Sequence, residues 1–222
     1  MTNNQTKSKQ RVADHGEVFT AEREVNAMLD LVKHETERID SRFLEPACGD
    51  GNFLVEILRR KLAVVKSRYG KNPPDYEFYA VIAITSIYGV DILQDNVNDC
   101  QERLYKIFND QYTDICKKDA NNETRETVRF ILERNILCGN ALDLKTTDGE
   151  PIVFSEWSAV NGFFIKRRDF RLDEMLEGHQ SGFMYEMFDW EYDNEIKAYI
   201  PKPFRQFEAT HYKIIKQAKE IL

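Results

Sequence analysis

A short apolar run that ends in an acid, a proline and a glycine turn limits what this chain can fold into more than any other feature of it. Residues 43–54 read Phe-Leu-Glu-Pro-Ala-Cys-Gly-Asp-Gly-Asn-Phe-Leu, which predicts a strand, a tight loop and a helix that starts at about Asn52. Gly49 and Gly51 allow positive φ and let the backbone approach a ligand closely. Free N–H groups at the helix start add partial positive charge. The stretch therefore predicts a loop for a nucleotide-like cofactor, although no Walker-type Gly-Lys-Ser/Thr follows.

The same stretch resembles motif I of S-adenosylmethionine-dependent DNA adenine-N6 methyltransferases, in its glycines and also in the residues that flank them. The alternative is an ordinary strand-turn-helix that binds no ligand. The resemblance implies an α/β fold with a Rossmann-like class I methyltransferase sheet, and S-adenosylmethionine as the cofactor. It also implies that the following residues of the motif bind this cofactor: Glu45, Pro46, Ala47, Cys48, Gly49, Gly51, Asn52 and Phe53.

Two residues near the N-terminus resemble motif X of the same family. Phe19 and Thr20 match its Phe-Thr, while Ala21 stands where the family usually has proline. Proline there only pre-sets φ in the first helical turn, so alanine is tolerable. The resemblance implies that Phe19 and Thr20 contact the cofactor. The residues alone also allow Thr20 to be the N-cap, and Phe19 the hydrophobic staple, of a helix over 21–33.

A buried strand over 88–92 ends in an acid and resembles motif II. Asp91 at this strand end can accept hydrogen bonds from both ribose hydroxyls, and Ile92 can pack on the adenine ring. The competing interpretation is an acid that caps the next helix, because Asp95 and Asn96 also offer caps.

A third strand and turn over 134–142 resemble motif III. Asn140 takes the place of the family's usual acid, and Ala141 follows it at the expected cofactor site. The asparagine can accept from the adenine amine or donate to the neighbouring ring nitrogen. It can equally well form an Asx turn.

The family's catalytic motif IV, Asn/Asp-Pro-Pro-aromatic, has no convincing match, so we assign no catalytic residue. Asn72-Pro73-Pro74-Asp75 follows a helix end and has an acid where the aromatic residue belongs, so we interpret it as a turn. Ser155-Glu156-Trp157 is a degenerate alternative that lacks the amide or carboxylate. A β-hairpin over 152–166, with Asn161-Gly162 at its turn, is the better prediction.

Without motif IV the expected sheet is incomplete, and the motif I strand keeps one open edge that the rest of the chain or another chain must cover. We expect three parts: a flexible tail over 1–14, a cofactor-binding Rossmann-like domain over 15–143, and an extension over 144–222. Helices are predicted over 54–69, 77–87, 96–116 and 123–133. The extension is predicted to hold the hairpin, an acidic and aromatic strip over 183–195 and a terminal helix over 206–222.

The composition limits the partners. A formal net charge of −7 at pH 7 makes the chain a poor binder of DNA by itself, so DNA contact is expected only through a complex. Four cysteines without paired spacing indicate reduced thiols in a cytoplasmic chain rather than a metal site. No apolar run is long enough to span a membrane.

These features lead to one main hypothesis and two others. The main one is the S-adenosylmethionine-binding subunit of a split DNA adenine-N6 methyltransferase from a restriction-modification or related defence system. Its partner is a second chain with the target-base half, or a second copy of this chain. The second hypothesis is a non-catalytic, methyltransferase-like interaction protein. The third is a small complete methyltransferase that uses Ser155-Glu156-Trp157 as its acceptor site.

Overall fold

A central sheet of mainly parallel strands organises the molecule. A computed structural model describes residues 7–15, 17–175, 190–193 and 198–222. The sheet has the order β1-β2-β3-β4, with strands β1 (Phe43–Glu45), β2 (Ile87–Asp91), β3 (Ile136–Asn140) and β4 (Lys145–Thr146). The first three strands are parallel and β4 is antiparallel to β3. Parallel strands joined through helices give the methyltransferase-like α/β fold that the sequence predicted.

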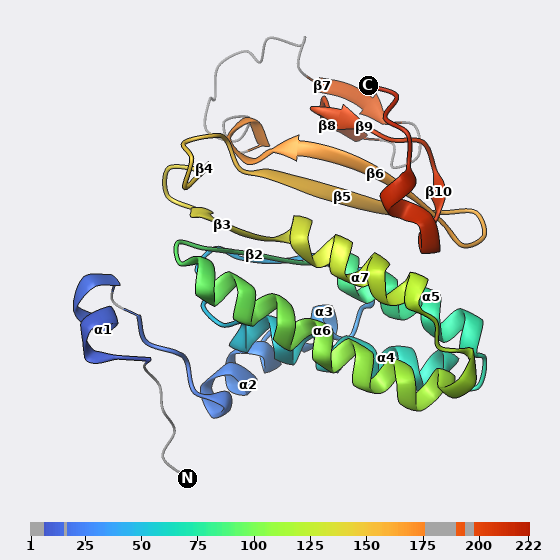
Figure 1. The fold of residues 1–222 in the computed structure, drawn as a ribbon, viewed down its shortest axis with the longest axis horizontal. Coiled ribbons are helices and arrows are strands. Elements are labelled where there is room, and N and C mark those ends of the chain that lie inside the picture. The colour runs from blue at the N-terminus through green and yellow to red at the C-terminus, as the bar shows by residue number, and fades with distance from the viewer. Residues whose placement is uncertain (1–6, 16, 176–189, 194–197) are drawn as a thin grey trace.

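Helices connect the parallel strands and cover the sheet. In Figure 1, α4 and α6 lie on one side of the sheet and the hairpin β5–β6 lies on the other. The helices have these bounds: α1 Lys9–His15, α2 Glu22–Asp30, α3 Lys33–Thr36, α4 Asn52–Tyr69, α5 Pro73–Thr85, α6 Gln94–Cys116 and α7 Asn122–Asn135, with the short 3-10 helices η1 Lys117–Asp119 and η2 Tyr212–Gln217. None of the described helices is long and apolar enough to cross a membrane.

Local sequence explains where the connecting helices begin. Helix α4 starts directly after Gly51, and Leu54 and Leu58, four residues apart, are fully buried on its inner side. Helix α5 starts with Asn72 as N-cap and two prolines in its first turn, and the amide of Asn72 donates to Asp75 at 2.6 Å. Asn-Pro-Pro is therefore a helix start in this chain and not the turn that the sequence predicted, so the helix predicted over 77–87 begins four residues earlier, at Pro73.

The register of the parallel strands brings three polar residues to one edge of the sheet. Glu45 pairs with Gly89, two residues before Asp91, and Asp91 pairs with Cys138, two residues before Asn140. Each strand therefore extends two residues further than the one before it. Asn140 ends the neighbouring strand. Among the described residues β1 pairs only with β2, which leaves its other edge open, as the sequence predicted.

The predicted hairpin is confirmed. Strands β5 (Val153–Val160) and β6 (Phe164–Arg171) are antiparallel, and Gly162 in the turn has φ of +74°. The hydroxyl of Tyr88 on β2 donates to the carbonyl of Ser155 at 2.9 Å, which fixes the hairpin to the central sheet. The short strands β7 (Trp190–Asp193) and β8 (Ala198–Pro201) pair with each other.

The predicted terminal helix over 206–222 is wrong. Strands β9 (Arg205–Gln206) and β10 (Thr210–His211) pair with β6, and only η2 is helical, with a kink at Ile214. The backbone groups along β6 offer partners that a continuous helix would leave unpaired, so the tertiary context overrides the local pattern.

Other boundaries also differ from expectation. Residues 9–14 of the expected flexible tail lie in helix α1, and the helix predicted over 21–33 ends at Asp30. Residues 1–6 of that tail and most of the acidic, aromatic strip over 183–195 lie outside the described residues.

A buried carboxylate attaches the C-terminal segment to the helices. Glu77 on α5 is 4% exposed and forms an ion pair with Lys213 at 2.7 Å. It also accepts hydrogen bonds from four neighbouring side chains: Tyr112, Asn121, Thr124 and Tyr212. Burial by itself raises the pKa of Glu77, but the hydrogen bonds from Lys213, Tyr112, Tyr212 and Thr124 outweigh burial and hold the pKa below its ordinary value of 4.5.

We expect Glu77→Gln to lower the free energy of unfolding by about 3 kcal/mol at pH 7, because it leaves Lys213 without its buried partner. A carboxylate with a lowered pKa stabilises the fold above its unfolded value and loses that effect as the pH falls through the folded value. The difference between the two proteins should therefore shrink below pH 4.5. Urea denaturation at several pH values measures it.

The matched control is Glu126→Gln. Glu126 is the exposed ion-pair partner of Lys216, which lies on the same 3-10 helix, η2, as Lys213. This substitution should cost less than about 0.5 kcal/mol. Equal losses for the two variants would contradict the role assigned to Glu77.

Candidate functional site

A cavity of about 700 Å³ lies at the carboxyl ends of β1, β2 and β3. It brings together all but one of the residues that the sequence predicted to bind a cofactor. Those in its lining are Phe19, Thr20, Glu45, Pro46, Ala47, Cys48, Gly49, Asn52, Phe53, Asp91, Ile92, Asn140 and Ala141. Gly51 does not line it. Such a volume is within the range of about 300–1,000 Å³ that small-molecule sites occupy.

The glycine loop after β1 needs both of its glycines, for different reasons. Gly49 has φ of +52°, and a Cβ there would lie 3.1 Å from the ring of Phe19. Gly51 has φ of +91°, and a Cβ there would lie 2.5 Å from the sulfur of Cys100. The N–H of Gly51 donates to the carbonyl of Cys48 at 2.8 Å. Gly49 therefore makes room for the wall of the cavity, while Gly51 closes the turn and lets α4 pack on α6.

Asp91 holds this loop to the rest of the sheet. Its carboxylate accepts the N–H of Gly49 at 2.9 Å, the N–H of Leu93 at 2.9 Å and the side-chain amide of Asn96 at 3.2 Å. The residue is 9% exposed. The sequence suggested either ribose binding or capping of the next helix for this acid, and it did not suggest the bond to Gly49. Only the spacing from Asp91 to Leu93, typical of an Asx turn, gave a local signal.

Glu45 differs from Asp91 in its hydrogen bonds: neither forms an ion pair with the described residues, but Asp91 accepts three hydrogen bonds and Glu45 accepts only one, from the backbone of Ala47. It is half-buried at the end of β1 and lines the cavity. Burial raises the pKa of Glu45 above its ordinary value, and a hydrogen bond from the backbone of Ala47 offsets only part of this. A half-buried carboxylate of this kind favours a cationic group beside it, which would relieve the cost of its burial.

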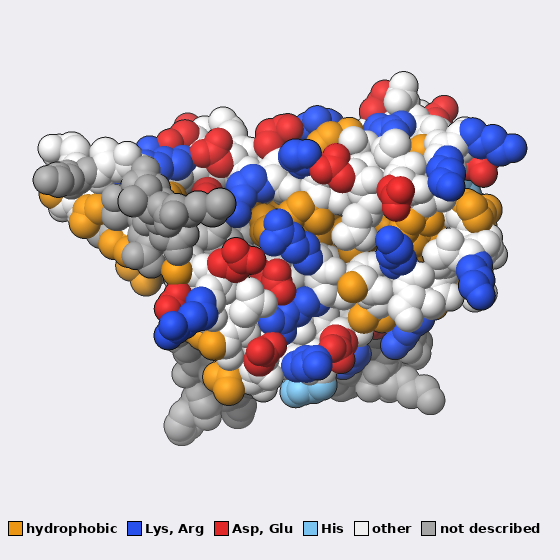
Figure 2. Space-filling view, turned by 90° about the horizontal axis from the view of Figure 1, so that it is seen from below, with side chains coloured by type: hydrophobic (Ala, Val, Ile, Leu, Met, Phe, Trp, Pro, Cys, Tyr) orange, Lys and Arg blue, Asp and Glu red, His pale blue; other side chains and the backbone are white. Residues whose placement is uncertain are grey.

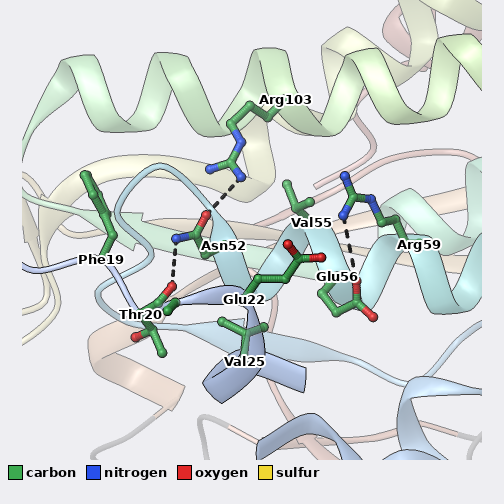
Figure 3. A pocket seen from close by; sticks show the side chains of 10 residues that line it. Phe19, Thr20, Glu22, Val25, Asn52, Val55, Glu56, Arg59 and Arg103 are labelled. Carbon is green, nitrogen blue, oxygen red and sulfur yellow. Dashed lines mark hydrogen bonds and ion pairs between the residues drawn. The ribbon is translucent and has the colours of Figure 1, made fainter. Parts of the chain in front are cut away.

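The segment around Thr20 forms one wall of the cavity. Figure 3 shows Asn52 between Thr20 and Arg103, in a smaller adjoining pocket of about 240 Å³. The amide of Asn52 donates to the carbonyl of Thr20 at 3.1 Å and accepts from Arg103 at 2.9 Å. Thr20 is not the N-cap of α2, because Ala21 occupies that position without a side-chain bond. The ring of Phe19 lies against Gly49.

The rim near β3 is largely apolar. Asn140 forms the Asx turn that was one of its predicted alternatives, since its side-chain oxygen accepts the N–H of Leu142 at 2.9 Å. Its amide nitrogen has no partner among the described residues and is left to donate. Ile92 is 46% exposed, and Leu142, which the sequence did not single out, is 94% exposed. Two exposed apolar side chains at a cavity rim suit a flat, apolar ligand surface.

Sequence reasoning missed Glu17 and Asn96, which also line the cavity. They are joined by a hydrogen bond of 2.8 Å from the amide of Asn96 to Glu17. Arg11 forms two bonds of 2.7 Å to Glu17, and these hydrogen bonds hold the pKa of Glu17 below its ordinary value. No local sequence pattern indicates the contact between Glu17 and Asn96, because they are 79 positions apart in the chain and meet only in the fold.

The degenerate acceptor triplet Ser155-Glu156-Trp157 does not line this cavity. Ser155 bonds to Asp169 at 2.7 Å, and Trp157 donates to Asn135 at 2.9 Å. Glu156 forms ion pairs with arginines. All three side chains therefore serve the packing of the hairpin.

A glycine loop and strand-end acids around one cavity, on a parallel sheet, define a methyltransferase-like α/β protein. Comparison agrees with this class: an alignment over 125 residues, which covers 54% of the chain, shows 28% identity to DNA methyltransferase A of Bacillus subtilis strain 168. The match covers 14% of that protein, so the chain corresponds to a small part of it. No family model matches the chain. No solved structure matches it either. This weak similarity supports a relationship to the DNA methyltransferases.

We expect Asp91→Asn to loosen the glycine loop, because an amide must turn its NH2 group toward the N–H of either Gly49 or Leu93. The free energy of unfolding should fall by about 1–3 kcal/mol. Amide hydrogen exchange at Gly49 or at Leu93 should accelerate, and two-dimensional NMR measures both. Asp110→Asn, which alters an exposed pair with Lys106, is the control. Unchanged exchange at both amides would show that Asp91 does not anchor the loop.

Proposed function

We propose that this chain is the S-adenosylmethionine-binding part of a DNA adenine-N6 methyltransferase whose target-base half is carried by a second chain. A cytoplasmic restriction-modification or related defence system is the setting in which we place it. The observation that carries the proposal is the half-buried carboxylate of Glu45, without an ion pair among the described residues, in the same cavity as the glycine loop and Asp91.

The residues of the cavity fit the groups of this cofactor. Glu45 suits its cationic ammonium and sulfonium. Asp91 uses three of the roughly four acceptor sites of a carboxylate within the protein, which leaves one for a ribose hydroxyl. Ile92 and Leu142 suit the faces of the adenine ring, and the amide of Asn140 suits a ring nitrogen. S-adenosylmethionine, when bound, supplies an electrophilic methyl group.

The acceptor half of the site has no candidate among the described residues that line the cavity. Asn72-Pro73-Pro74 begins α5, and Ser155-Glu156-Trp157 packs the hairpin. A target adenine must be taken out of its stack and its amine held by hydrogen bonds before methyl transfer. We therefore assign base binding to the partner and cofactor binding to this chain.

The open edge of β1 supports the position we propose for that partner. Leu44 on this edge is 49% exposed. A groove of about 410 Å³ lies beside it, between β1 and the hairpin, and Phe154, Phe170 and Met175 contribute to its apolar lining. An exposed strand edge next to an apolar groove is a place where another chain can add a strand. A second copy of this chain is the other candidate for this place.

Electrostatics supports DNA contact through the complex. The chain carries a formal net charge of −7. Figure 2 shows acidic and basic side chains mixed over the face seen from below. Phosphate contacts supply most of the non-specific affinity for DNA, so a mixed, net-acidic surface is a weak DNA binder. The alternative function, a non-catalytic methyltransferase-like interaction protein, would need no open cofactor cavity.

Isothermal titration calorimetry of the purified chain with S-adenosylmethionine tests the cofactor. We expect saturable binding, and we expect Glu45→Gln to raise Kd by about tenfold or more because it removes a charged hydrogen-bond acceptor. Glu24→Gln, on the exposed side of α2, is the control and should leave Kd unchanged. If millimolar S-adenosylmethionine produces no binding heat and no thermal shift, the proposal is rejected in favour of the interaction protein.

The division between two chains predicts that this chain alone transfers no methyl group to DNA. Transfer of tritium from methyl-labelled S-adenosylmethionine to adenine-rich duplex DNA measures it. For the chain alone, we expect no more tritium in the DNA than a heat-denatured sample of the chain gives. Methylation of adenine by the single purified chain would overturn the split enzyme and leave the cofactor assignment standing.

A further inference from the structure

Helix α1 lies at the same end of the molecule as the carboxyl ends of β2 and β3 (Figure 1). Arg11 on this helix is the residue that joins it to the cofactor cavity. Its guanidinium binds both carboxylate oxygens of Glu17 at 2.7 Å, the side-chain oxygen of Asn96 at 3.1 Å and Asp95 at 2.6 Å. Glu17 and Asn96 line the cavity, whereas Arg11 does not. The arginine therefore reaches the cavity only through other side chains.

The contacts continue from Arg11 to the glycine loop without a break. Asn96 donates to Glu17 at 2.8 Å and to Asp91 at 3.2 Å. Asp91 in turn accepts the N–H of Gly49 at 2.9 Å. Because the amide of Asn96 uses both its oxygen and its nitrogen here, the guanidinium fixes which way this amide faces. The orientation of Asn96 is what presents its donor to Asp91.

Charge gives Arg11 a second effect on the same wall. The side chain of Glu17 is 7% exposed, and Arg11 forms its only ion pair among the described residues. An unpaired carboxylate this deep would either draw in water or move out toward solvent. Either movement would displace Val18, Phe19 and Thr20, which follow it along the wall of the cavity.

We propose that Arg11 is a positioning residue of the cofactor site: through Glu17 and Asn96 it holds the wall over 17–20 closed and keeps Asp91 on the glycine loop. The inference rests on the proposed function for its ligand, an adenosyl compound. It assigns a role at the site to a segment that the sequence indicated was only a tail. The bidentate contact explains why arginine is required, since a lysine cannot bond to Glu17 and Asn96 in the same way.

The chain offers a matched control on the same segment. Lys7 pairs with Asp95 at 3.3 Å and Asp99 at 2.6 Å, and it acts on Glu17 only through its charge at longer range, without a hydrogen bond or ion pair to Glu17 or Asn96. Removing Lys7 therefore weakens the attachment of the N-terminal segment to α6 and leaves the contacts of Arg11 in place. A difference between variants at these two positions separates positioning of the site from attachment of the helix.

Titration calorimetry with S-adenosylmethionine and with S-adenosylhomocysteine on the full chain tests the proposal. We expect Arg11→Ala to raise both Kd values by about tenfold or more, Arg11→Lys to give an intermediate value, and Lys7→Ala to change them by less than about twofold. The melting temperature of the free protein should stay within about 3 °C of wild type for each variant. Equal effects of Arg11→Ala and Lys7→Ala would overturn the proposal.

A double-mutant cycle tests whether Arg11 acts through Glu17. If it does, Arg11→Ala in a Glu17→Gln background should raise Kd by less than about threefold, because the carboxylate that it pairs with is already gone. The full effect of Arg11→Ala in that background would show that the arginine acts by another route and would overturn this part of the proposal.

Hydrogen exchange without ligand keeps the failure of this proposal distinct from that of the proposed function. In Arg11→Ala the amide of Gly49 should exchange at least about fivefold faster than in wild type, and in Lys7→Ala it should not. If wild type binds neither adenosyl compound, the proposed function fails, and this exchange alone decides whether Arg11 positions the loop. Unchanged exchange at Gly49 in Arg11→Ala would reject the positioning role.

Discussion

One carboxylate, that of Asp91, ties together the three elements that make the cavity. It accepts a backbone N–H from the loop after β1 and another at the start of α6, and it lies at the end of β2 itself. Gly49 and Gly51 have φ of +52° and +91°, and because they carry no Cβ, sterics alone restrict the conformation of this loop less than that of other loops. The carboxylate of Asp91, which has a fixed place at the end of β2, holds the loop in one conformation by accepting the N–H of Gly49. The shape of the cavity therefore depends on an interaction between residues 42 positions apart.

The carboxylates around the cavity divide into two kinds, and the difference determines what the site can bind. Asp91, Glu17 and Asp50 are bound by donors of the protein itself, Asp50 by Arg103 at 2.6 Å, so their charge is used in holding the structure. Glu45 is left with burial and one backbone bond. Since a buried charge is costly unless it is paired, a ligand with a positive group gains most at Glu45. A cavity in which all four of these acids were unpaired would instead attract cations of any kind.

The sequence predicts much of the site because its signals are local. A glycine pair after a strand, an acid at a strand end and an asparagine at a turn each depend on a few neighbouring residues, and the parallel sheet collects them at one edge. The roles of Arg11, Glu17 and Asn96 depend on the contacts that Asn96 makes with the other two across more than 75 positions, for which a single sequence holds no pattern. The C-terminal segment was mispredicted for a similar reason, because its partner is the edge of β6.

The way the second face of the sheet is covered explains how the described sheet can be stable and still leave one edge of β1 open. The hairpin covers this face, and Tyr88 on β2 donates to the carbonyl of Ser155. Helix η2 packs on α7 and β6, and its Tyr212 donates to Glu77 on α5. These contacts hold the extension over β2 and the helices rather than beside β1. The edge of β1 therefore stays accessible without loss of the core. The partner that we propose for that edge would meet the strand whose far end carries Glu45, next to the cavity.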